Sequence, residues 1–535
     1  MRRADERHGT IPRMVRAVAA RFGTRDAIVD GELHLTFADV EVGMFAVARS
    51  LLARGVTPGD RIALWAPNSA SWITTALAVH AVGAWLVPLN TRLKGDEAAF
   101  ILDKADARIL FAADGFLGTD YVGSVRAVAP ALRAVRDAVA VPLPGQPAAP
   151  GWDGFLVEGE VVPRAEVEAS IATGSPDDVS DVIFTSGTTG TPKGVMLRHG
   201  ASLRGYELIA ERFGLDEGDR YLIPTPFFHC FGYKAGWLIS LLRGATAFPL
   251  AVFDADVVLE LLERERITHF PGPPTMFSAI LDHSRRAAHD LSSLQHAFVG
   301  AATIPEVLVR RLRDELHVPS ILSAYALTES HAICTATAPD DDPETVATTV
   351  GRPLPEVELR LVDDDGDEVP VGADGEILIR SPFRMTGYFE EPEATAAVLI
   401  DGWLHTGDVG RLDERGYLRI TDRKKDLFIV GGFNVAPAEV EKALAGCAGV
   451  AQVAVVGMPD DYFGEVGAAF VVPRDGAMVT ADAVFAHART HLANFKVPRR
   501  VEIVDALPVN ATGKVLKGEL RARLRDGSNT SSAEG

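Results

Sequence analysis

Phe184-Thr185-Ser186-Gly187-Thr188-Thr189-Gly190-Thr191-Pro192-Lys193-Gly194 is the most informative stretch of this chain. It continues the apolar run Val182-Ile183-Phe184, which predicts a buried strand. Its glycines and short hydroxyl side chains leave backbone N–H groups open to a polyphosphate, and Lys193 adds a positive charge. A Walker A loop is excluded, because Pro192 precedes the lysine and Gly194 follows it. A flexible linker is the alternative, but linkers rarely follow directly on a strand, so we predict a phosphate-binding loop.

Length and charge limit the class of protein. A chain of 535 residues is too long for one ordinary core, which predicts two or more domains. The formal net charge of −20 argues against nucleic acid as a partner, because basic surfaces hold phosphate backbones. The cysteines Cys230, Cys334 and Cys447 are widely separated, have no metal-ligand spacing and favour a reducing cytoplasm.

Two segments bear on localisation. Residues 1–7 are charged and lead into no apolar run, so we expect no signal peptide. From Ile62 to Thr91 there is no Asp, Glu, Lys or Arg, a pattern that can indicate a membrane span. Pro67 and Pro88 interrupt it, which favours a buried strand, helix and strand. We therefore expect a cytoplasmic protein without integral membrane association.

Alternating helical and apolar patterns predict an α/β protein. The predicted elements are a helix over 37–54, a strand over 61–65, a helix over 71–82, strands over 85–88, 357–362, 376–380 and 417–421, a helix over 437–445, strands over 452–456 and 468–472, and a helix over 479–492. Residues 140–175, rich in Pro, Gly and acidic side chains, predict a loose surface segment.

The predicted fold has two domains. Residues 1–424 form a large N-terminal domain of layered sheets and helices with a β-rich subdomain. Residues 425–525 form a small α+β domain, and residues 526–535 a disordered tail.

Further motifs follow the loop in chain order. They are Pro226-Phe227-Phe228-His229-Cys230-Phe231-Gly232, Gly300-Ala301-Ala302 with Ala324-Tyr325-Ala326-Leu327-Thr328-Glu329, Trp403-Leu404-His405-Thr406-Gly407-Asp408 with Arg423, and Leu507-Pro508-Val509-Asn510-Ala511-Thr512-Gly513-Lys514. Each alone has a plain interpretation, as a core cluster, a strand end, a turn or a solvated lysine. Together with the 184–194 stretch they cover nearly the whole chain and resemble the adenylate-forming superfamily of acyl-CoA synthetases, peptide-synthetase adenylation domains and firefly luciferase.

The resemblance implies that the N-terminal domain holds the ATP and acyl sites and that the small C-terminal domain is mobile. Tyr325 would stack on adenine, Thr328 would contact the α-phosphate, and Glu329 would hold Mg²⁺, which prefers oxygen ligands. Asp408 would accept hydrogen bonds from both ribose hydroxyls, with Arg423 as its companion. Lys514, the implied catalytic lysine, would act with Lys193 and Mg²⁺ to neutralise charge at the α-phosphate. The remaining nucleotide contacts would come from Thr185, Ser186, Gly187, Thr188, Thr189, Gly190 and Ala324.

The resemblance also implies acyl and CoA sites. His229 would act as a gate between the acyl pocket and the nucleotide. The pocket candidates carry no charge, which favours an apolar acid over an amino acid; they are Phe231, Trp237, Gly300, Ala301, Ala302 and Ala326. Ala326 stands where the family usually has glycine, so its methyl group would narrow the space beside the adenylate. Lys425 is the implied hinge, and the CoA contacts would come from Gly431, Gly432, Phe433 and Asn434. The basic residues Lys496, Arg499 and Arg500 are either contacts for the CoA phosphates or a solvated surface patch.

We predict an AMP-forming acyl-CoA synthetase that uses ATP, CoA and Mg²⁺ and activates a small-molecule carboxylic acid. The stretches 227–236, 271–277 and 491–499 resemble actinobacterial synthetases that activate ring-bearing propionates from steroid degradation, with medium-chain fatty acids or aryl acids as alternatives. A ligase that loads a carrier protein and a luciferase-like oxygenase are rival interpretations. A non-catalytic adenylate-binding protein is a third, but it should have lost Lys193, Glu329 or Lys514. The sequence leaves the oligomeric state open, a homo-oligomer included.

Overall fold

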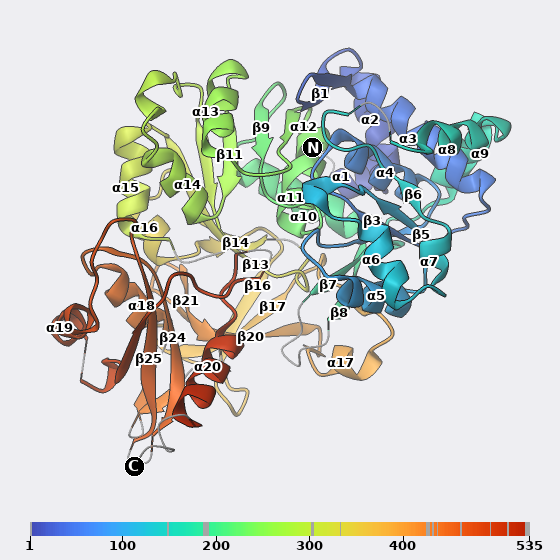
Figure 1. Cartoon of the computed structure of the whole chain (residues 1–535). Coiled ribbons are helices and arrows are strands. Elements are labelled where there is room, and N and C mark those ends of the chain that lie inside the picture. The colour runs from blue at the N-terminus through green and yellow to red at the C-terminus, as the bar shows by residue number, and fades with distance from the viewer. Residues whose placement is uncertain are drawn as a thin grey trace.

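The computed structural model describes residues 3–146, 149–185, 192–300, 304–331, 333–423, 428–430, 433–435, 437–460, 463–492, 494–510 and 513–529 (Figure 1). Several predicted site residues lie outside these ranges, and the predictions made for them stay predictions: Ser186, Gly187, Thr188, Thr189, Gly190, Ala301, Ala302, Lys425, Gly431 and Gly432. The side chains of Arg423, Phe433 and Asn434 also lie outside the description.

A seven-stranded sheet carries the predicted phosphate loop. Its order is β18-β8-β7-β4-β3-β5-β6. The strands are β3 (Arg61–Trp65), β4 (Trp85–Pro88), β5 (Ala107–Ala112), β6 (Val139–Ala140), β7 (Val179–Thr185), β8 (Lys193–Arg198) and β18 (Gly387–Tyr388). β7 and β8 pair antiparallel with Thr185 opposite Lys193, so the predicted loop connects two adjacent strands. Val182 and Ile183 are buried, as the apolar run predicted.

The uncharged segment 62–91 forms β3, helix α4 (Ala70–Ala81) and β4. Ser69 caps the helix by accepting a hydrogen bond from the Trp72 N–H over 3.1 Å. Every residue of α4 except Ser71 is buried, and a helix that is apolar all round belongs in a protein interior. Within the described ranges, no helix combines the length and the hydropathy needed to cross a membrane.

A nine-stranded sheet carries the motifs that begin at Gly300 and at Ala324. Its order is β15-β14-β13-β12-β11-β9-β10-β1-β2. The strands are β1 (Asp26–Asp30), β2 (Leu33–Thr36), β9 (Arg220–Ile223), β10 (Thr246–Pro249), β11 (His269–Gly272), β12 (His296–Val299), β13 (Ser320–Ala326), β14 (Ile333–Ala336) and β15 (Arg352–Pro353). The run from β1 to β13 is parallel, so the carboxyl ends that carry Gly300 and Thr328 share one edge, where open α/β sheets bind ligands.

Helices cover the two sheets (Figure 1). They are α1 (Ala4–His8), α2 (Ile11–Phe22), α3 (Phe37–Ala53), α5 (Gly95–Lys104), α6 (Tyr121–Val128), α7 (Arg133–Arg136), α10 (His199–Arg212), α11 (Cys230–Gly232), α12 (Ile239–Arg243), α13 (Ala255–Arg264), α14 (Pro274–Leu281), α15 (Glu306–Glu315), α16 (Pro343–Thr348) and α17 (Pro392–Ala396). Between α11 and α12 lies η3 (Tyr233–Leu238), one turn of π-helix.

The remainder of the chain forms two smaller sheets. The β-rich section contains β16 (Glu358–Val362), β17 (Asp374–Arg380), β19 (Leu399–Ile400), β20 (Trp403–Leu412) and β21 (Leu418–Arg423). The C-terminal part, orange to red in Figure 1, contains β22 (Phe428–Val430), β23 (Phe433–Val435), α18 (Pro437–Ala445), β24 (Val450–Asp460), β25 (Gly464–Pro473), α19 (Ala481–His491), β26 (Arg500–Ile503) and α20 (Lys517–Asn529). This part has hydrophobic clusters of its own, and α18 contacts β21.

The α/β fold is confirmed, with two local corrections. Residues 140–175 are not loose, because α8 (Trp152–Glu158) and α9 (Arg164–Thr173) form there. Trp152 and Phe155 pack edge-on against Phe111, with ring centroids 6.4 and 5.5 Å away, so apolar spacing outweighed the Pro and Gly content. At the other end, α20 continues to Asn529, so residues 526–529 of the predicted tail are helical.

Candidate active site

Lys193 begins β8 at the end of the predicted phosphate loop. Its Nζ lies 5.0 Å from the ring centroid of Tyr388, an attractive cation–π distance. The two meet because β18 pairs with β8, where Tyr388 lies opposite Val195. The loop lysine is therefore held over an aromatic ring that comes from nearly two hundred residues further along the chain.

The same Tyr388 also contacts the predicted magnesium ligand. Its hydroxyl donates a hydrogen bond to Oε1 of Glu329 over 3.1 Å. Burial, with the Glu329 carboxylate beside it, raises the pKa of Tyr388, so the phenol stays a donor at neutral pH. One ring thus connects the ammonium of Lys193 to the carboxylate of Glu329. The sequence interpretation did not identify Tyr388, and only the β18–β8 pairing reveals it.

Thr328 and Glu329 lie on a tight turn after β13. Ser330 Oγ accepts a hydrogen bond from the Leu327 N–H over 3.1 Å, and the His331 N–H donates to the Thr328 carbonyl over 2.9 Å. Thr328 is buried, whereas Glu329 is half-buried, with its carboxylate bonded to the Tyr388 hydroxyl.

Glu329 fits a magnesium ion that is shared with a substrate. In the part of the chain that the structure describes, no three His, Cys, Asp or Glu side chains gather as a metal site. Mg²⁺ does not require such a cage, because it commonly takes one or two carboxylates and completes its shell with water and substrate phosphates. A single half-buried carboxylate suits that arrangement.

The predicted adenine and ribose contacts are bonded to each other. The hydroxyl of Tyr325 donates to Oδ2 of Asp408 over 2.5 Å. Both residues are buried, and burial together with the Asp408 carboxylate raises the pKa of Tyr325. Asp408 lies on β20, directly opposite Arg423 of β21 in the strand register. The structure therefore brings Tyr325, Asp408 and the backbone of Arg423 together.

His229 is the N-cap residue of the short helix α11 in the aromatic motif. Its Nδ1 accepts a hydrogen bond from the Phe231 N–H over 3.2 Å at the start of α11. Burial lowers the pKa of His229 to about 4, so the ring is neutral at pH 7 and its proton is on Nε2. A neutral imidazole anchored to the backbone fits the predicted gate better than a general base.

Two of the acyl-pocket candidates lie together. The ring of Phe231 packs edge-on against Phe298, with centroids 5.1 Å apart. A methyl group placed on Gly300 would lie 3.6 Å from Phe298 and 3.8 Å from Phe231, so this glycine borders the same pair of rings. Ala326 is exposed at the end of β13.

Trp237 differs from the prediction. It is 0% exposed, stacks on Tyr233 at 4.8 Å and packs edge-on against Trp72 at 6.0 Å. Trp237 lies on the π-helical turn η3 and its side chain is in the core, so it packs within the protein and offers no surface to a substrate.

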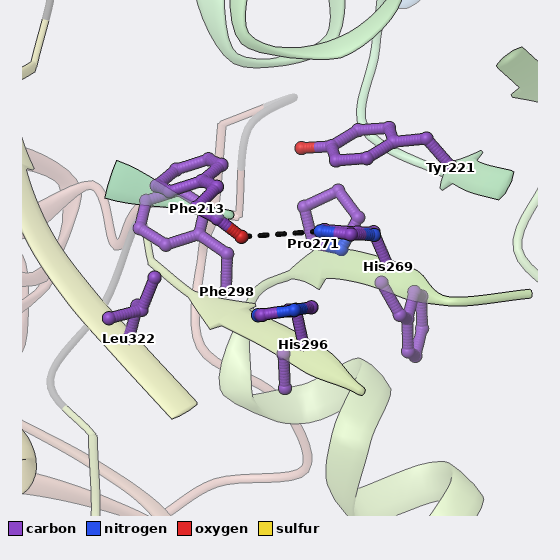
Figure 2. Close-up of a pocket in the computed structure, with 9 residues that line it drawn as sticks. Phe213, Tyr221, His269, Pro271, His296, Phe298 and Leu322 are labelled. Carbon is purple, nitrogen blue, oxygen red and sulfur yellow. Dashed lines mark hydrogen bonds between the residues drawn. The ribbon is translucent and has the colours of Figure 1, made fainter. Parts of the chain in front are cut away.

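A small cavity lies behind Phe298 (Figure 2). The rings of His269 and His296 stack in it at 4.3 Å, and His269 Nε2 donates to the Phe213 carbonyl over 3.2 Å. Burial is the main reason that the pKa of His269 is lowered to about 3. Its lining residues are Phe213, Tyr221, His269, Phe270, Pro271, His296, Ala297, Phe298 and Leu322. Phe298, which lines the cavity, also packs against Phe231.

The C-terminal residues form the predicted turn. The Lys514 N–H donates to Asn510 Oδ1 over 2.9 Å, and the Asn510 N–H donates to the Lys514 carbonyl over 2.8 Å. Gly513 adopts φ +83°, which favours glycine, and Lys514 is exposed. Whether Lys514 joins Lys193 at one nucleotide stays a prediction. Among the proposed CoA contacts, Arg500 pairs with Glu502 over 2.6 Å.

Comparison with known proteins identifies the family. Residues 15–389 match the model of the AMP-binding enzyme family, and residues 439–514 match the AMP-binding enzyme C-terminal domain. The chain is 48% identical, over 96% of its length and 98% of the relative, to the 3-[(3aS,4S,7aS)-7a-methyl-1,5-dioxo-octahydro-1H-inden-4-yl]propanoyl:CoA ligase of Mycobacterium tuberculosis. It is 47% identical to the ligase of the same name from Rhodococcus jostii, over 96% of this chain and 99% of that one.

A solved structure has the same fold. The anthranilate CoA ligase AuaEII in complex with anthranoyl-AMP superimposes with a TM-score of 0.87 at 28% identity, over 96% of this chain and 97% of that one. The match of the family model to residues 15–389, which is more than half of the chain, carries the assignment. This protein belongs to the family of AMP-binding enzymes, the adenylate-forming superfamily that its motifs resemble.

Proposed function

We propose that this protein is an AMP-forming acyl-CoA synthetase. In the first step a carboxylate oxygen attacks the α-phosphorus of ATP, and pyrophosphate leaves to give an acyl-adenylate. In the second step the CoA thiol gives up its proton, its sulfur attacks the acyl carbonyl carbon, and AMP leaves to give the thioester. The observation that carries the proposal is that Lys193, which follows the predicted phosphate loop in the sequence, and the Glu329 carboxylate both contact Tyr388.

The residues of the chain divide the work of adenylation. Lys193 neutralises phosphate charge, and Thr328 contacts the α-phosphate from the turn after β13. Glu329 is the ligand for Mg²⁺, which when bound offsets negative charge on the phosphates. Tyr325 and Asp408 position the adenosine, and Lys514 adds the second ammonium group. Thr185, at the end of β7, begins the loop that completes the nucleotide contacts.

The second step uses the same site after the small domain has turned about Lys425. In this proposal Lys514 leaves the nucleotide, and the residues around Phe433 approach the pantetheine arm of CoA. His229, neutral and fixed to the backbone by its Nδ1, stands between the acyl group and the nucleotide during adenylation. The chemistry needs no acid or base with an unusual pKa, because positioning and charge neutralisation carry it.

The acid that we propose is a ring-bearing propionate of the steroid-derived kind. Two relatives at 48% and 47% identity are ligases for a methyl-dioxo-octahydroindenyl propanoate. The described pocket candidates Phe231, Gly300 and Ala326 are uncharged, as an apolar ring substrate requires. The cytoplasm is the compartment that supplies the ATP and CoA this reaction consumes.

A pyrophosphate-release screen tests the proposal. The purified enzyme is offered short, medium-chain, aryl and ring-bearing propionic acids with ATP and Mg²⁺, with and without CoA. The expected result is AMP and a thioester in the presence of CoA, with the highest kcat/KM for a ring-bearing propionate. Absence of AMP with every acid would contradict the proposed reaction. Adenylate without thioester would point to a carrier protein as the acceptor, and highest activity on a medium-chain acid would overturn the proposed substrate.

A further inference from the structure

A fully buried ion pair lies behind the proposed site. The side chains of Lys234 and Asp181 are both 0% exposed, and Lys234 Nζ donates a hydrogen bond to Asp181 Oδ2. Lys234 Nζ also donates to Ser202 Oγ over 2.7 Å. Burying two charges costs several kcal/mol per ion before their attraction offsets it, so a buried pair is weak evidence for stability. Its location offers a better explanation.

The aspartate end of the pair lies on the strand that leads into the predicted phosphate loop. Asp181 is on β7, four residues before Thr185, where the loop begins. Its Oδ1 accepts a hydrogen bond from the Tyr233 hydroxyl over 2.6 Å, and its Oδ2 accepts one from Ser180 Oγ over 2.5 Å. His80 Nε2 lies 2.6 Å from the same Tyr233 hydroxyl. Asp181 thus fixes the strand from which the loop departs.

The lysine end reaches the turn that carries Glu329. Ser202, which accepts from Lys234, lies on α10, the helix that follows β8. Its Oγ is 2.7 Å from Nε2 of His331, two residues after Glu329. The carbonyl of His331 accepts a hydrogen bond from the Tyr206 hydroxyl over 2.8 Å, so this residue is held at two points.

Two irregular backbone features occur along this chain of contacts. His331 has φ +68°, a left-handed conformation that costs a residue with a side chain of the order of 1–3 kcal/mol. Lys234 lies in the π-helical turn η3, a form that is frequent at functional sites. Both irregular residues take part in the network, since the imidazole of His331 contacts Ser202 and the ammonium of Lys234 contacts Asp181 and Ser202.

We propose that Lys234 is a positioning residue for adenylation. Through Asp181 on one side and Ser202–His331 on the other, it fixes the separation between the start of the phosphate loop and the Glu329 carboxylate. The π-helix that carries Lys234 directly follows His229 and Phe231, so the aromatic gate is fixed to the same frame. The inference rests on the proposed function, because the separation matters only if both segments contact one Mg²⁺–ATP.

The test uses variants that remove the connection without leaving a lone charge. Lys234→Met alone would leave Asp181 buried and unpaired, so the main variant is Lys234→Met with Asp181→Asn, which keeps shape and removes both charges. Ser202→Ala is the second variant, since it removes the connection to His331 but retains the ion pair. Leu238→Ala is the matched control: Leu238 is a fully buried residue of the same helix, and its contacts are apolar.

Three measurements are made on each variant: thermal unfolding, the calorimetric Kd of Mg²⁺–ATP, and pyrophosphate exchange with a ring-bearing propionate. We expect the double variant and Ser202→Ala to unfold cooperatively but to lose about 10- to 100-fold in the kcat of exchange and in Mg²⁺–ATP affinity, the loss expected of a small misplacement. Thioester formation from supplied acyl-adenylate should change little. Leu238→Ala should lower the melting temperature and leave kcat per folded molecule unchanged.

The outcomes separate the two proposals. Wild-type exchange and Mg²⁺–ATP affinity in the double variant and in Ser202→Ala would overturn the positioning role. So would losses in Leu238→Ala equal to theirs, since these would show that any loss of core stability has the same effect. If the wild-type enzyme binds Mg²⁺–ATP but none of the acids supports pyrophosphate exchange, the proposed function is refuted. The affinity measurement would still decide the role of Lys234.

Discussion

The hydroxyl of Tyr325 donates a hydrogen bond to the carboxylate of Asp408 over 2.5 Å, and this contact joins two sheets. Tyr325 lies near the carboxyl end of β13 in the nine-stranded sheet, and Asp408 lies on β20 of the β-rich section. The surface proposed for adenine and the carboxylate proposed for ribose are therefore set relative to each other by one bond.

We predict that Tyr325→Phe will raise the KM for ATP. The ring is kept, but a buried hydrogen bond to a charged group is lost, which is worth about 1.5–3 kcal/mol or about 10- to 100-fold. Initial rates of pyrophosphate exchange over a range of ATP concentrations measure the change. Tyr221→Phe is the control. The Tyr221 hydroxyl donates a hydrogen bond of 2.8 Å to the Ala235 carbonyl, and neither residue is a proposed nucleotide contact. Equal effects in the two variants would show that the Tyr325–Asp408 bond has no special role.

Tyr388 should control the magnesium requirement. Tyr388→Phe removes the hydrogen bond to Glu329 while keeping the ring beside Lys193. Loss of an outer partner of a metal ligand typically weakens metal binding about 10- to 100-fold, so the Mg²⁺ concentration for half-maximal activity should rise by that order. Tyr388→Leu should in addition lower kcat, since Lys193 loses its aromatic neighbour. Magnesium titrations of exchange activity decide the matter, and an unchanged midpoint in Tyr388→Phe would contradict the assigned contact.

Lys514→Ala should separate the two half-reactions. Without the second ammonium group, adenylation should fall by about 10²–10³ or more, the effect of removing a group that stabilises transition-state charge. Thioester formation from supplied acyl-adenylate should be largely retained, because in the proposed mechanism Lys514 has left the site by that step. Separate rapid-mixing assays of each step measure this, and equal losses in both would remove Lys514 from the first step.

Lys425→Pro should have the opposite effect. Proline fixes φ near −65°, so a turn of the small domain about this residue would be hindered. Adenylation should proceed, whereas CoA-dependent turnover should fall. Lys425→Ala, which leaves φ free, is the matched control. Normal thioester production by the proline variant would refute the hinge.

Acid should destabilise the protein below pH 6.5. Burial is the main cause that lowers the pKa of His80 and of His229 to about 4 and that of His269 to about 3. Between these values and the ordinary 6.5 of an unfolded histidine, the unfolded chain binds a proton that the folded chain does not. The contribution of these histidines to the free energy of unfolding is therefore lost as the pH falls, by about 1.4 kcal/mol for each pH unit and each histidine.

Urea unfolding at several pH values between 7.5 and 4.5 measures this slope. His269→Gln should flatten it, because one buried neutral imidazole is gone. His34→Gln is the control, since the side chain of His34 is 53% exposed. A slope that does not change in His269→Gln would mean that other groups govern the acid sensitivity.

The sequence alone determined the local elements and the family. The strand β3 and the helix α18 have the bounds that their apolar patterns predicted. The spacing of apolar residues along the chain indicates which faces of an element are buried, and this spacing is a local property of the sequence. The order of the motifs, from Thr185 to Lys514, likewise sufficed to identify an adenylate-forming enzyme, since each motif is a local arrangement of backbone and short side chains.

Only the tertiary structure decided which of these residues meet. Tyr388 reaches Lys193 and Glu329 through the pairing of β18 with β8, and no local pattern around Tyr388 encodes that pairing. Trp237 is a large uncharged side chain, as expected of a residue in an apolar pocket, yet it lies on a π-helical turn and is buried in the core. Lys234 resembles any lysine in the sequence, but it is buried against Asp181. These outcomes depend on packing between segments far apart in the chain, and the energies of such contacts exist only once the fold has formed.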